Sequence, residues 1–251
     1  MKVLIGLAAL VPVAFLSSGA IAQDEKEAPE SYVYATYFTC DVTKQDRADE
    51  IVNSRDAPVY NAAVEDGTIT GWGWLAHHTG GEWRRILYSS ATSMEALFAA
   101  QAKINEAQDE ASGDNSEFGS ICNSHDDYVW HGVAGSGGNL LAEKRGKVGL
   151  SAYHICKMSE EEQADELIKT VFAPVYDAHV GDGKLRSWGW SEHIVGGKYR
   201  RLATFTADDL PTLFKARASI FEALEDNDKA DEFSKICGSH SDYIWEIQIE
   251  S

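Results

Sequence analysis

The sequence predicts an α+β protein made of two tandem βαββαβ repeats. The main observation is an internal repeat, because Trp72-Gly73-Trp74 returns as Trp188-Gly189-Trp190 at an offset of 116 residues. Further along, Ile121-Cys122 returns as Ile236-Cys237 at an offset of 115 residues. A repeat of about a hundred residues has the size of one small domain and is too long for a solenoid unit. Two such units in one chain predict a built-in dimer.

The predicted elements follow the same order in both repeats. In repeat 1, a β-rich run (32–40) precedes a helical segment that Pro58 kinks or restarts. Asp66-Gly67 ends this segment, because glycine supplies the left-handed residue. A hairpin follows, with a strand on each side of Gly80-Gly81, which suits a tight turn. A second helix (93–108), a short third helical piece and a last strand complete the unit.

This order is that of the ferredoxin-like unit. We place repeat 1 at 32–131, a Gly/Ser-rich and charged linker at 132–147, and repeat 2 at 148–251. A tandem of such units resembles the dimeric α/β-barrel superfamily. The resemblance implies an intramolecular dimeric α/β barrel, with two four-stranded sheets packed face to face and helices outside. The superfamily includes cofactor-free monooxygenases, muconolactone isomerase-like proteins, haem-handling enzymes and stress-responsive proteins. The chain matches no catalytic motif of a single branch.

The first 31 residues are expected to lie outside the fold. Lys2, an apolar run and the small-x-small site Ala20-Ile21-Ala22 are typical of a secretory signal peptide at 1–22, cut after Ala22. Residues 23–31 then form an acidic linker. We therefore expect a periplasmic or secreted protein with no membrane span in its mature chain. An uncleaved anchor helix is the alternative.

Charge and motifs exclude several partners. The formal net charge of −18 argues against nucleic acid and anionic lipid, which need clustered Lys and Arg. The sequence motifs of covalent haem, phosphate-binding loops, serine hydrolases and zinc peptidases are absent. We therefore predict no cofactor and no metal, with non-covalent haem left open. A homo-oligomer is also left open.

The four cysteines occupy equivalent places in the two repeats. In a ferredoxin-like sheet the first and last strands are neighbours, which predicts the disulfides Cys40–Cys122 and Cys156–Cys237. Sequence alone allows three connectivities. A thiol nucleophile or metal ligand is the alternative reading, because a histidine and an aspartate closely follow Cys122 and Cys237.

Strand alternation suggests where a ligand could bind. A turn at Gly80-Gly81 pairs residues whose numbers sum to 161 in repeat 1, and the equivalent sum in repeat 2 is 393. An aliphatic face is expected to pack under the helices, so that the aromatic face looks into the space between the sheets. The predicted ligand-binding residues are Trp72, Trp74, Arg85, Trp188, Trp190 and Arg201. Arginine there would suit an aromatic anion, whereas core packing by the tryptophans is the alternative.

Four histidines are candidate catalytic residues. His77 and His193 lie near the hairpin tips beside arginines, which favour a neutral imidazole that can act as a base. His125 and His240 each precede an aspartate by two residues, an arrangement that orients a general acid or base. Ser-His-x-Asp is also ordinary turn chemistry, so structural roles are the alternative for all four.

These observations favour an exported, small-molecule-binding or stress-related protein that encloses an apolar or aromatic ligand between its sheets. The alternative is a cofactor-independent monooxygenase or isomerase acting on a small aromatic or lactone-like substrate. Ala76 is expected opposite Arg85, whereas Glu192 is expected opposite Arg201. Only Arg85 then lacks an opposing acid, so a site is expected to be asymmetric and to lie in repeat 1.

Overall fold

The computed structural model describes residues 30–112, 116–137 and 145–251. The signal peptide expected at 1–22 lies outside the described residues. The same is true of most of the acidic linker and of residues 138–144 of the linker between the repeats.

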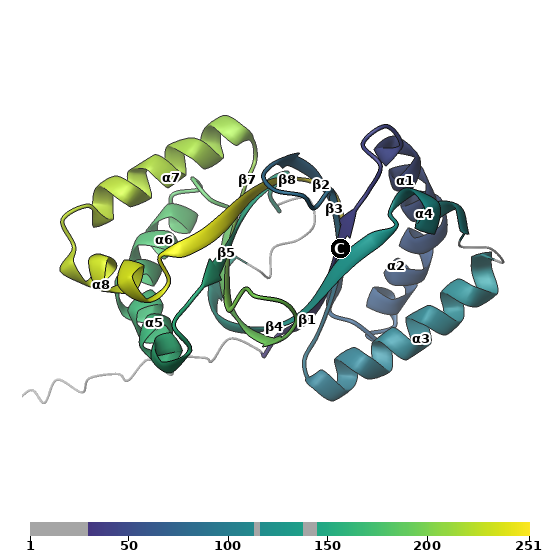
Figure 1. Cartoon of the computed structure of the whole chain (residues 1–251), viewed down its shortest axis with the longest axis horizontal. Coiled ribbons are helices and arrows are strands. Elements are labelled where there is room, and N and C mark those ends of the chain that lie inside the picture. Colours follow the sequence, from purple (N-terminus) through teal and green to yellow (C-terminus); the bar gives the residue numbers. More distant parts are fainter. Residues whose placement is uncertain (1–29, 113–115, 138–144) are drawn as a thin grey trace, which may run out of the picture.

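Eight strands within the described ranges form one closed antiparallel barrel, in the order β1-β3-β2-β8-β5-β7-β6-β4 (Figure 1). The strands are β1 (Tyr32–Thr39), β2 (Gly71–Thr79), β3 (Arg85–Ala91), β4 (Ser124–Ser136), β5 (Val148–Ile155), β6 (Ser187–Val195), β7 (Arg201–Ala207) and β8 (Ser239–Glu250). The barrel closes because β2 pairs with β8 and β4 pairs with β6. Each repeat therefore covers the sheet edges of the other, so that the backbone N–H and C=O groups of these edge strands find partners.

The last strand of repeat 1 is longer than the sequence predicted. β4 continues through Gly132 and Ala134 to Ser136, and these residues pair with β6. The predicted start of the linker, at residue 132, is therefore too early. The extra length lets β4 reach the other repeat and close the barrel.

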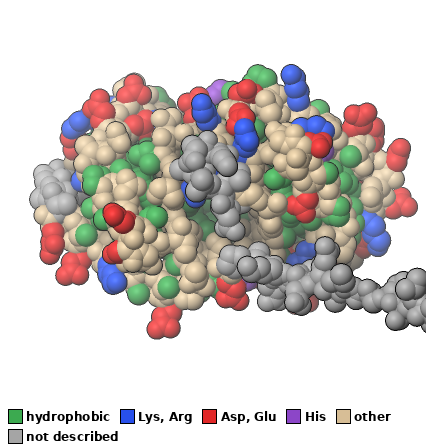
Figure 2. Space-filling view, turned by 180° about the vertical axis from the view of Figure 1, so that it is seen from behind, with side chains coloured by type: hydrophobic (Ala, Val, Ile, Leu, Met, Phe, Trp, Pro, Cys, Tyr) green, Lys and Arg blue, Asp and Glu red, His purple; other side chains and the backbone are tan. Residues whose placement is uncertain are grey.

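Helices cover the barrel on two opposite sides (Figure 1). Repeat 1 contributes α1 (Gln45–Ile51), α2 (Ala57–Glu65), α3 (Met94–Ser112) and α4 (Ser116–Ile121). Repeat 2 contributes α5 (Glu161–Leu167), α6 (Ala173–Gly181), α7 (Leu210–Leu224) and α8 (Asp228–Ile236). No helix among the described residues is long and apolar enough to cross a membrane. Figure 2 shows Asp and Glu side chains spread around the rim of one face.

The proline in each repeat lies in the first turn of a new helix. A π-helical segment, Val52–Asp56, joins α1 to α2, and Pro58 follows it. Proline is tolerated there because the amide hydrogens of a first helical turn have no helical partner. Repeat 2 has the same arrangement, with a π-helical segment at Ile168–Phe172 before Pro174. In repeat 1 the wide turn carries Asp56 inward, where its side chain is buried.

The hairpin registers agree with the sequence prediction. Trp72 pairs with Ser89 in repeat 1, and Trp188 pairs with Phe205 in repeat 2. The turn needs glycine at position 80, where φ is 141° and a β-carbon would lie 2.7 Å from the ring of Tyr243. The tip of the repeat-1 hairpin therefore packs directly on repeat 2.

The predicted facing of the hairpin strands is wrong. The indole N–H of Trp72 donates to Asn61 on α2 at 2.9 Å, and that of Trp74 donates to Asp49 on α1 at 2.8 Å. Trp188 and Trp190 make the equivalent bonds to the helices of repeat 2. The tryptophan face thus lies under the helices. It does so because carboxylate and amide groups on the helices accept the hydrogen bonds of the indole N–H groups.

The two predicted anion-binding arginines are already paired. Arg85 donates two hydrogen bonds to the carboxylate of Asp49, at 2.6 and 2.7 Å, and is buried. Arg201 binds Asp165 in the same bidentate way. Glu192 pairs with Arg201 across the hairpin, as expected, and its carboxylate also lies 2.7 Å from Nδ1 of His131 across the seam between β4 and β6. Arg85 therefore does not lack an acid, and the predicted ligand contacts of both arginines are structural ion pairs.

Aromatic side chains pack the inside of the barrel. The interior cluster includes Tyr37, Trp130, Tyr153 and Trp245, each at most 2 % exposed. The ring of Trp83 stacks on that of Tyr37, with centroids 4.3 Å apart. Where the sequence suggested a ligand space between the sheets, the structure has an aromatic core.

Both disulfides occur as predicted. Cys40 is bonded to Cys122 and Cys156 to Cys237, and no described cysteine is free. Each bond ties the end of a first strand to the approach to a last strand. The thiol-nucleophile reading is therefore wrong.

We predict that Asp49→Asn lowers the free energy of unfolding by about 2–3 kcal/mol, because the buried Arg85 loses its counter-charge. Equilibrium urea unfolding measures the change. Asp46→Asn on the exposed side of α1 is the matched control, with a change within about 0.5 kcal/mol. Equal stabilities of the two variants would contradict the structural role of the Arg85–Asp49 pair.

Candidate functional site

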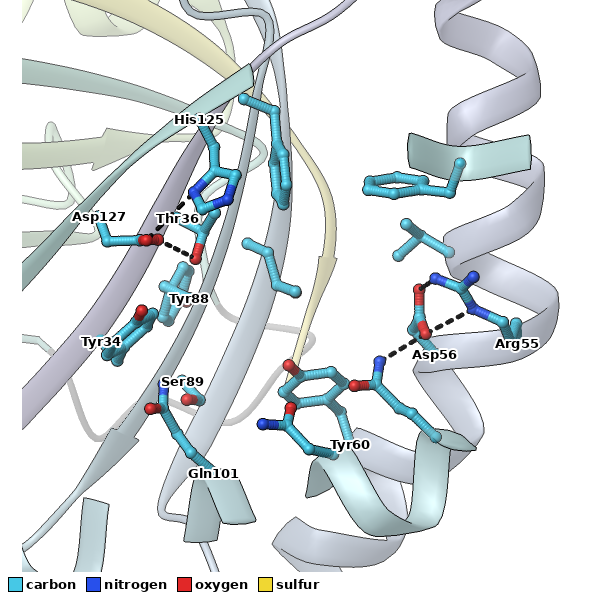
Figure 3. A pocket seen from close by; sticks show the side chains of 16 residues that line it. Tyr34, Thr36, Arg55, Asp56, Tyr60, Tyr88, Ser89, Gln101, His125 and Asp127 are labelled. Carbon is cyan, nitrogen blue, oxygen red and sulfur yellow. Dashed lines mark hydrogen bonds and ion pairs between the residues drawn. The ribbon is translucent and has the colours of Figure 1, made fainter. Parts of the chain in front are cut away.

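A cavity of about 370 Å³ lies in repeat 1 between the outer face of the sheet and the helices (Figure 3). Its sheet wall is formed by Tyr34, Thr36, Phe38, Leu87, Tyr88, Ser89, His125 and Asp127. Its helix wall is formed by Val52, Arg55, Asp56, Tyr60, Gln101, Asn105, Gln108 and Phe118. The volume falls within the range of small-molecule pockets. The lining is unusual because most of these side chains are polar.

A histidine–aspartate pair lies at one end of the sheet wall. Nδ1 of His125 is 3.1 Å from a carboxylate oxygen of Asp127, and the hydroxyl of Thr36 donates to the other oxygen at 2.8 Å. Figure 3 shows the second ring nitrogen of His125 turned toward the space between sheet and helices. Half of the His125 side chain is exposed. The pair can therefore exchange a proton with a molecule in the cavity.

A buried ion pair forms the opposite wall. Arg55 donates to both carboxylate oxygens of Asp56, at 2.8 and 2.7 Å, and Gln108 donates to one of them at 2.6 Å. Asp56 is 2 % exposed. Three strong donors offset the cost of burying this carboxylate. The Arg55 guanidinium also lies over the ring of Phe118, 5.6 Å from its centroid.

Neutral polar groups form the rest of the helix wall. Gln101, Asn105 and Gln108 follow one another at four- and three-residue spacing on α3, which puts them on one face of the helix. Burial raises the pKa of the Tyr60 phenol well above its usual value, and nearby Asp56 adds to the shift. Burial, with Asp127 next, also raises the pKa of Tyr34. Both phenols stay protonated and can donate hydrogen bonds.

Most of the polar cavity positions of repeat 1 carry apolar side chains in repeat 2. The replacements at offset 116 are Leu150 for Tyr34, Ala152 for Thr36, Val171 for Arg55, Phe172 for Asp56, Phe205 for Ser89, Phe221 for Asn105 and Leu224 for Gln108. Among these, Leu150, Phe172 and Leu224 are buried in the repeat-2 core. The two repeats share one backbone plan, so the polar cavity of repeat 1 is a property of its side chains.

The histidine pair of repeat 2 has different surroundings. Nδ1 of His240 lies 2.6 Å from Asp242, closer than the 3.1 Å of the His125–Asp127 pair, and Asp242 also binds Arg217 at 3.2 Å. Gln101 takes the place of Arg217 in repeat 1. His154 replaces Phe38, is buried, and its Nδ1 lies 3.0 Å from the carbonyl oxygen of Cys237.

His77 and His193 lie away from the cavity. Both pack against aromatic rings of the barrel interior, His77 beside Trp245 and His193 beside Trp130. Burial lowers the pKa of each, and Arg84 and Arg200 lower them further. The sequence predicted the neutral imidazoles, their arginine neighbours and the strand face that they share, but it expected that face to pack under the helices. Among the described residues, Nε2 of each is buried without a hydrogen-bond partner.

Sequence reasoning selected His125 and Asp127 but missed the remaining cavity residues. Asp56, Ser89 and Asn105 belong to no recognisable motif. A position-by-position comparison of the repeats could have found them, because each has an aromatic counterpart in repeat 2. The described residues contain no group of three or more His, Cys, Asp or Glu that could hold a metal ion.

Comparisons with known proteins show the fold. A candidate monooxygenase of Fusobacterium nucleatum superposes with a TM-score of 0.63 at 7 % identity, covering 90 % of this chain and 95 % of that one. A candidate monooxygenase of Lactobacillus acidophilus gives a TM-score of 0.58 at 10 % identity, covering 88 % and 95 %. The protein has the dimeric α/β-barrel fold. An anthrone oxidase-like protein gives 0.54 at 13 % identity, covering 90 % and 94 %. No protein-family model and no curated protein matches the chain.

His154 should make stability depend on pH. Burial lowers its pKa to about 4, although the Cys237 carbonyl opposes the shift. An unfolded histidine binds a proton below about pH 6.5, whereas the folded protein resists protonation until about pH 4, so stability falls as the pH drops through this window. We predict that His154→Phe, which introduces the residue type that repeat 1 has at this position (Phe38), reduces this pH-dependent loss of unfolding free energy by about 3 kcal/mol.

Urea unfolding at several pH values between 4 and 7 measures the effect. His78→Phe changes an exposed histidine and should keep the wild-type pH dependence. If the unfolding free energy of His154→Phe falls with pH as steeply as that of the wild type, His154 is not the source of the pH dependence.

Proposed function

We propose that the protein binds a small organic molecule in the repeat-1 cavity. The observation that carries this proposal is the difference between the repeats, polar and hollow in one and apolar in the other. Buried polar groups cost free energy that packed hydrocarbon does not. Repeat 2 shows that the same fold can carry apolar side chains at equivalent positions. Polar groups around an open cavity are therefore best explained by a ligand that uses them.

The proposal changes the ligand site that the sequence suggested. The tryptophans and arginines expected to hold a ligand are structural, and the space between sheet and helices replaces the space between the sheets. The proposed site again lies in repeat 1, although the sequence-based reason for this choice, an Arg85 without an acid, is wrong. The names of the similar structures, which include candidate monooxygenases and an anthrone oxidase-like protein, support a small organic ligand.

Export is part of the proposal. Two disulfides support it, because such bonds persist mainly in oxidising compartments. Intact-mass analysis of the protein from its native host would test for a mature chain that starts at Gln23. A mass that includes residues 1–22 would count against cleavage.

Filling the cavity should abolish binding. The double variant Ser89→Phe/Asn105→Phe introduces the side chains that repeat 2 carries at these places. We expect ligand affinity to fall by more than about a hundredfold, because the ring at the buried position 89 occupies the cavity and the ring at the exposed position 105 narrows its mouth. Isothermal titration with hits from a small-molecule library measures the loss. Glu106→Phe, on the exposed side of α3, is the control and should bind as the wild type does. Equal affinity in the filled variant would rule out the cavity as the site.

A second candidate function is a cofactor-independent monooxygenase or isomerase. The specific observation is the His125–Asp127 pair, hydrogen bonded to Thr36 and opening onto the cavity. Asp127 would hold the imidazole with its proton on Nδ1, which leaves Nε2 as the base. A proton taken from a bound hydroxyl or an acidic C–H would then rest on an imidazolium stabilised by the carboxylate.

Paired variants test this chemistry. With a turned-over substrate, we expect His125→Ala to lower kcat by about a hundredfold or more, because the base is lost, while ligand affinity changes little. His240→Ala removes the equivalent histidine of repeat 2 and should leave kcat unchanged. Similar activities of wild type and His125→Ala would exclude this histidine as the base.

A further inference from the structure

We infer that the repeat-1 cavity selects an uncharged, hydroxyl-rich ligand, a saccharide or a sugar-like polyol. This inference rests on the proposed function and names the ligand class for the same site. It replaces the aromatic anion that the sequence suggested. Three features of the cavity carry it: the pairing of its charges, the free hydrogen-bonding groups and the rings beside them.

The charged groups of the cavity are already paired with one another. Arg55 gives two hydrogen bonds to Asp56, and Asp127 accepts from Thr36 and lies beside His125. A carboxylate or phosphate ligand would therefore have to share Arg55 with a buried acid. Weakening this partnership would be unfavourable, because a buried carboxylate that loses part of its counter-charge is strongly destabilised. An anion is thus disfavoured although an arginine lines the wall.

The hydrogen-bonding groups left for a ligand are uncharged. The hydroxyls of Ser89 and Tyr60 and the side-chain amides of Gln101 and Asn105 line the cavity. None of these four groups hydrogen bonds to another described residue, and Ser89 and Tyr60 are at most 9 % exposed. Each can both donate and accept, as a ligand hydroxyl does. A ligand that displaces water from these groups must replace the hydrogen bonds that water makes with them, so they favour a ligand that satisfies several of them together.

Aromatic rings supply a complementary apolar surface. Phe38 and Phe118 lie at the same end of the cavity, with ring centroids 5.3 Å apart, and Leu87 is nearby. A sugar ring has faces of C–H groups and a rim of hydroxyls, which matches rings on one side and amides on the other. An aromatic hydrocarbon would satisfy the rings but leave the amides and hydroxyls without partners, a loss that discriminates strongly between ligands.

A matched panel tests the charge and hydroxyl requirements. The probes are glucose, galactose, mannose, myo-inositol, maltose and lactose, with glucuronate, galacturonate, glucosamine and benzoate as charged counterparts. Isothermal titration and saturation-transfer NMR measure binding to the full chain. We expect at least one neutral probe to bind, about tenfold or more tighter than its uronate, because the acid finds no free cation.

Two single substitutions test the contacts. Ser89→Ala and Gln101→Ala should each weaken the binding of that neutral probe by about tenfold, because each removes one buried hydrogen bond. Lys103→Ala, on the exposed surface of α3, is the control and should leave the affinity unchanged. Circular dichroism and thermal unfolding confirm that the variants are folded.

The outcomes separate the ligand class from the proposed function. No binding by any neutral probe, or tighter binding by a uronate or benzoate, overturns the saccharide inference. If such a charged probe binds the wild type but not Ser89→Phe/Asn105→Phe, the cavity remains the binding site and only the ligand class is wrong. If the filled variant binds every library hit as the wild type does, the proposed function fails as well.

Discussion

The arrangement of this protein depends on a repeated contact between one arginine, one aspartate and one tryptophan. In repeat 1 the carboxylate of Asp49 accepts from both Arg85 and Trp74, and in repeat 2 Asp165 does the same for Arg201 and Trp190. These contacts attach the first helix of each repeat to its hairpin. They thereby fix which strand face looks outward, and the opposite face must form the inside of the barrel.

Barrel closure joins the two repeats through equivalent contacts, but the layers between sheet and helices differ. Each last strand pairs with the hairpin of the other repeat, and the aromatic core inside is shared by both. Repeat 2 fills the space between its sheet and helices with phenylalanine and leucine, and so adds apolar burial. Repeat 1 keeps polar groups and a cavity at the equivalent places, which gives up part of that stabilisation. Loss of packing at a functional site is a common feature of natural proteins.

The same histidine–aspartate motif thus has two different settings. Around Asp242 an arginine neutralises the pair, and a buried histidine replaces the phenylalanine of repeat 1. Around Asp127 the partners are a threonine hydroxyl and the cavity. Side chains at neighbouring positions, rather than the motif, decide whether the histidine has access to a bound molecule.

The sequence by itself determined the duplication, the element order and the hairpin registers, because these depend on spacing along the chain. The disulfide pairing needed one further assumption, the ferredoxin-like strand order, which places the first and last strands side by side. It also selected His125 and Asp127 as a pair. The tertiary structure decided the facing of the strands, since a period of two defines two faces without saying which one the helices cover. Trp72 and Trp74 were expected inside the barrel, but acceptors on the helices hold them outside. The cavity likewise required the fold, because Asp56, Ser89 and Asn105 come from three separate elements and become neighbours only when helices pack on the sheet.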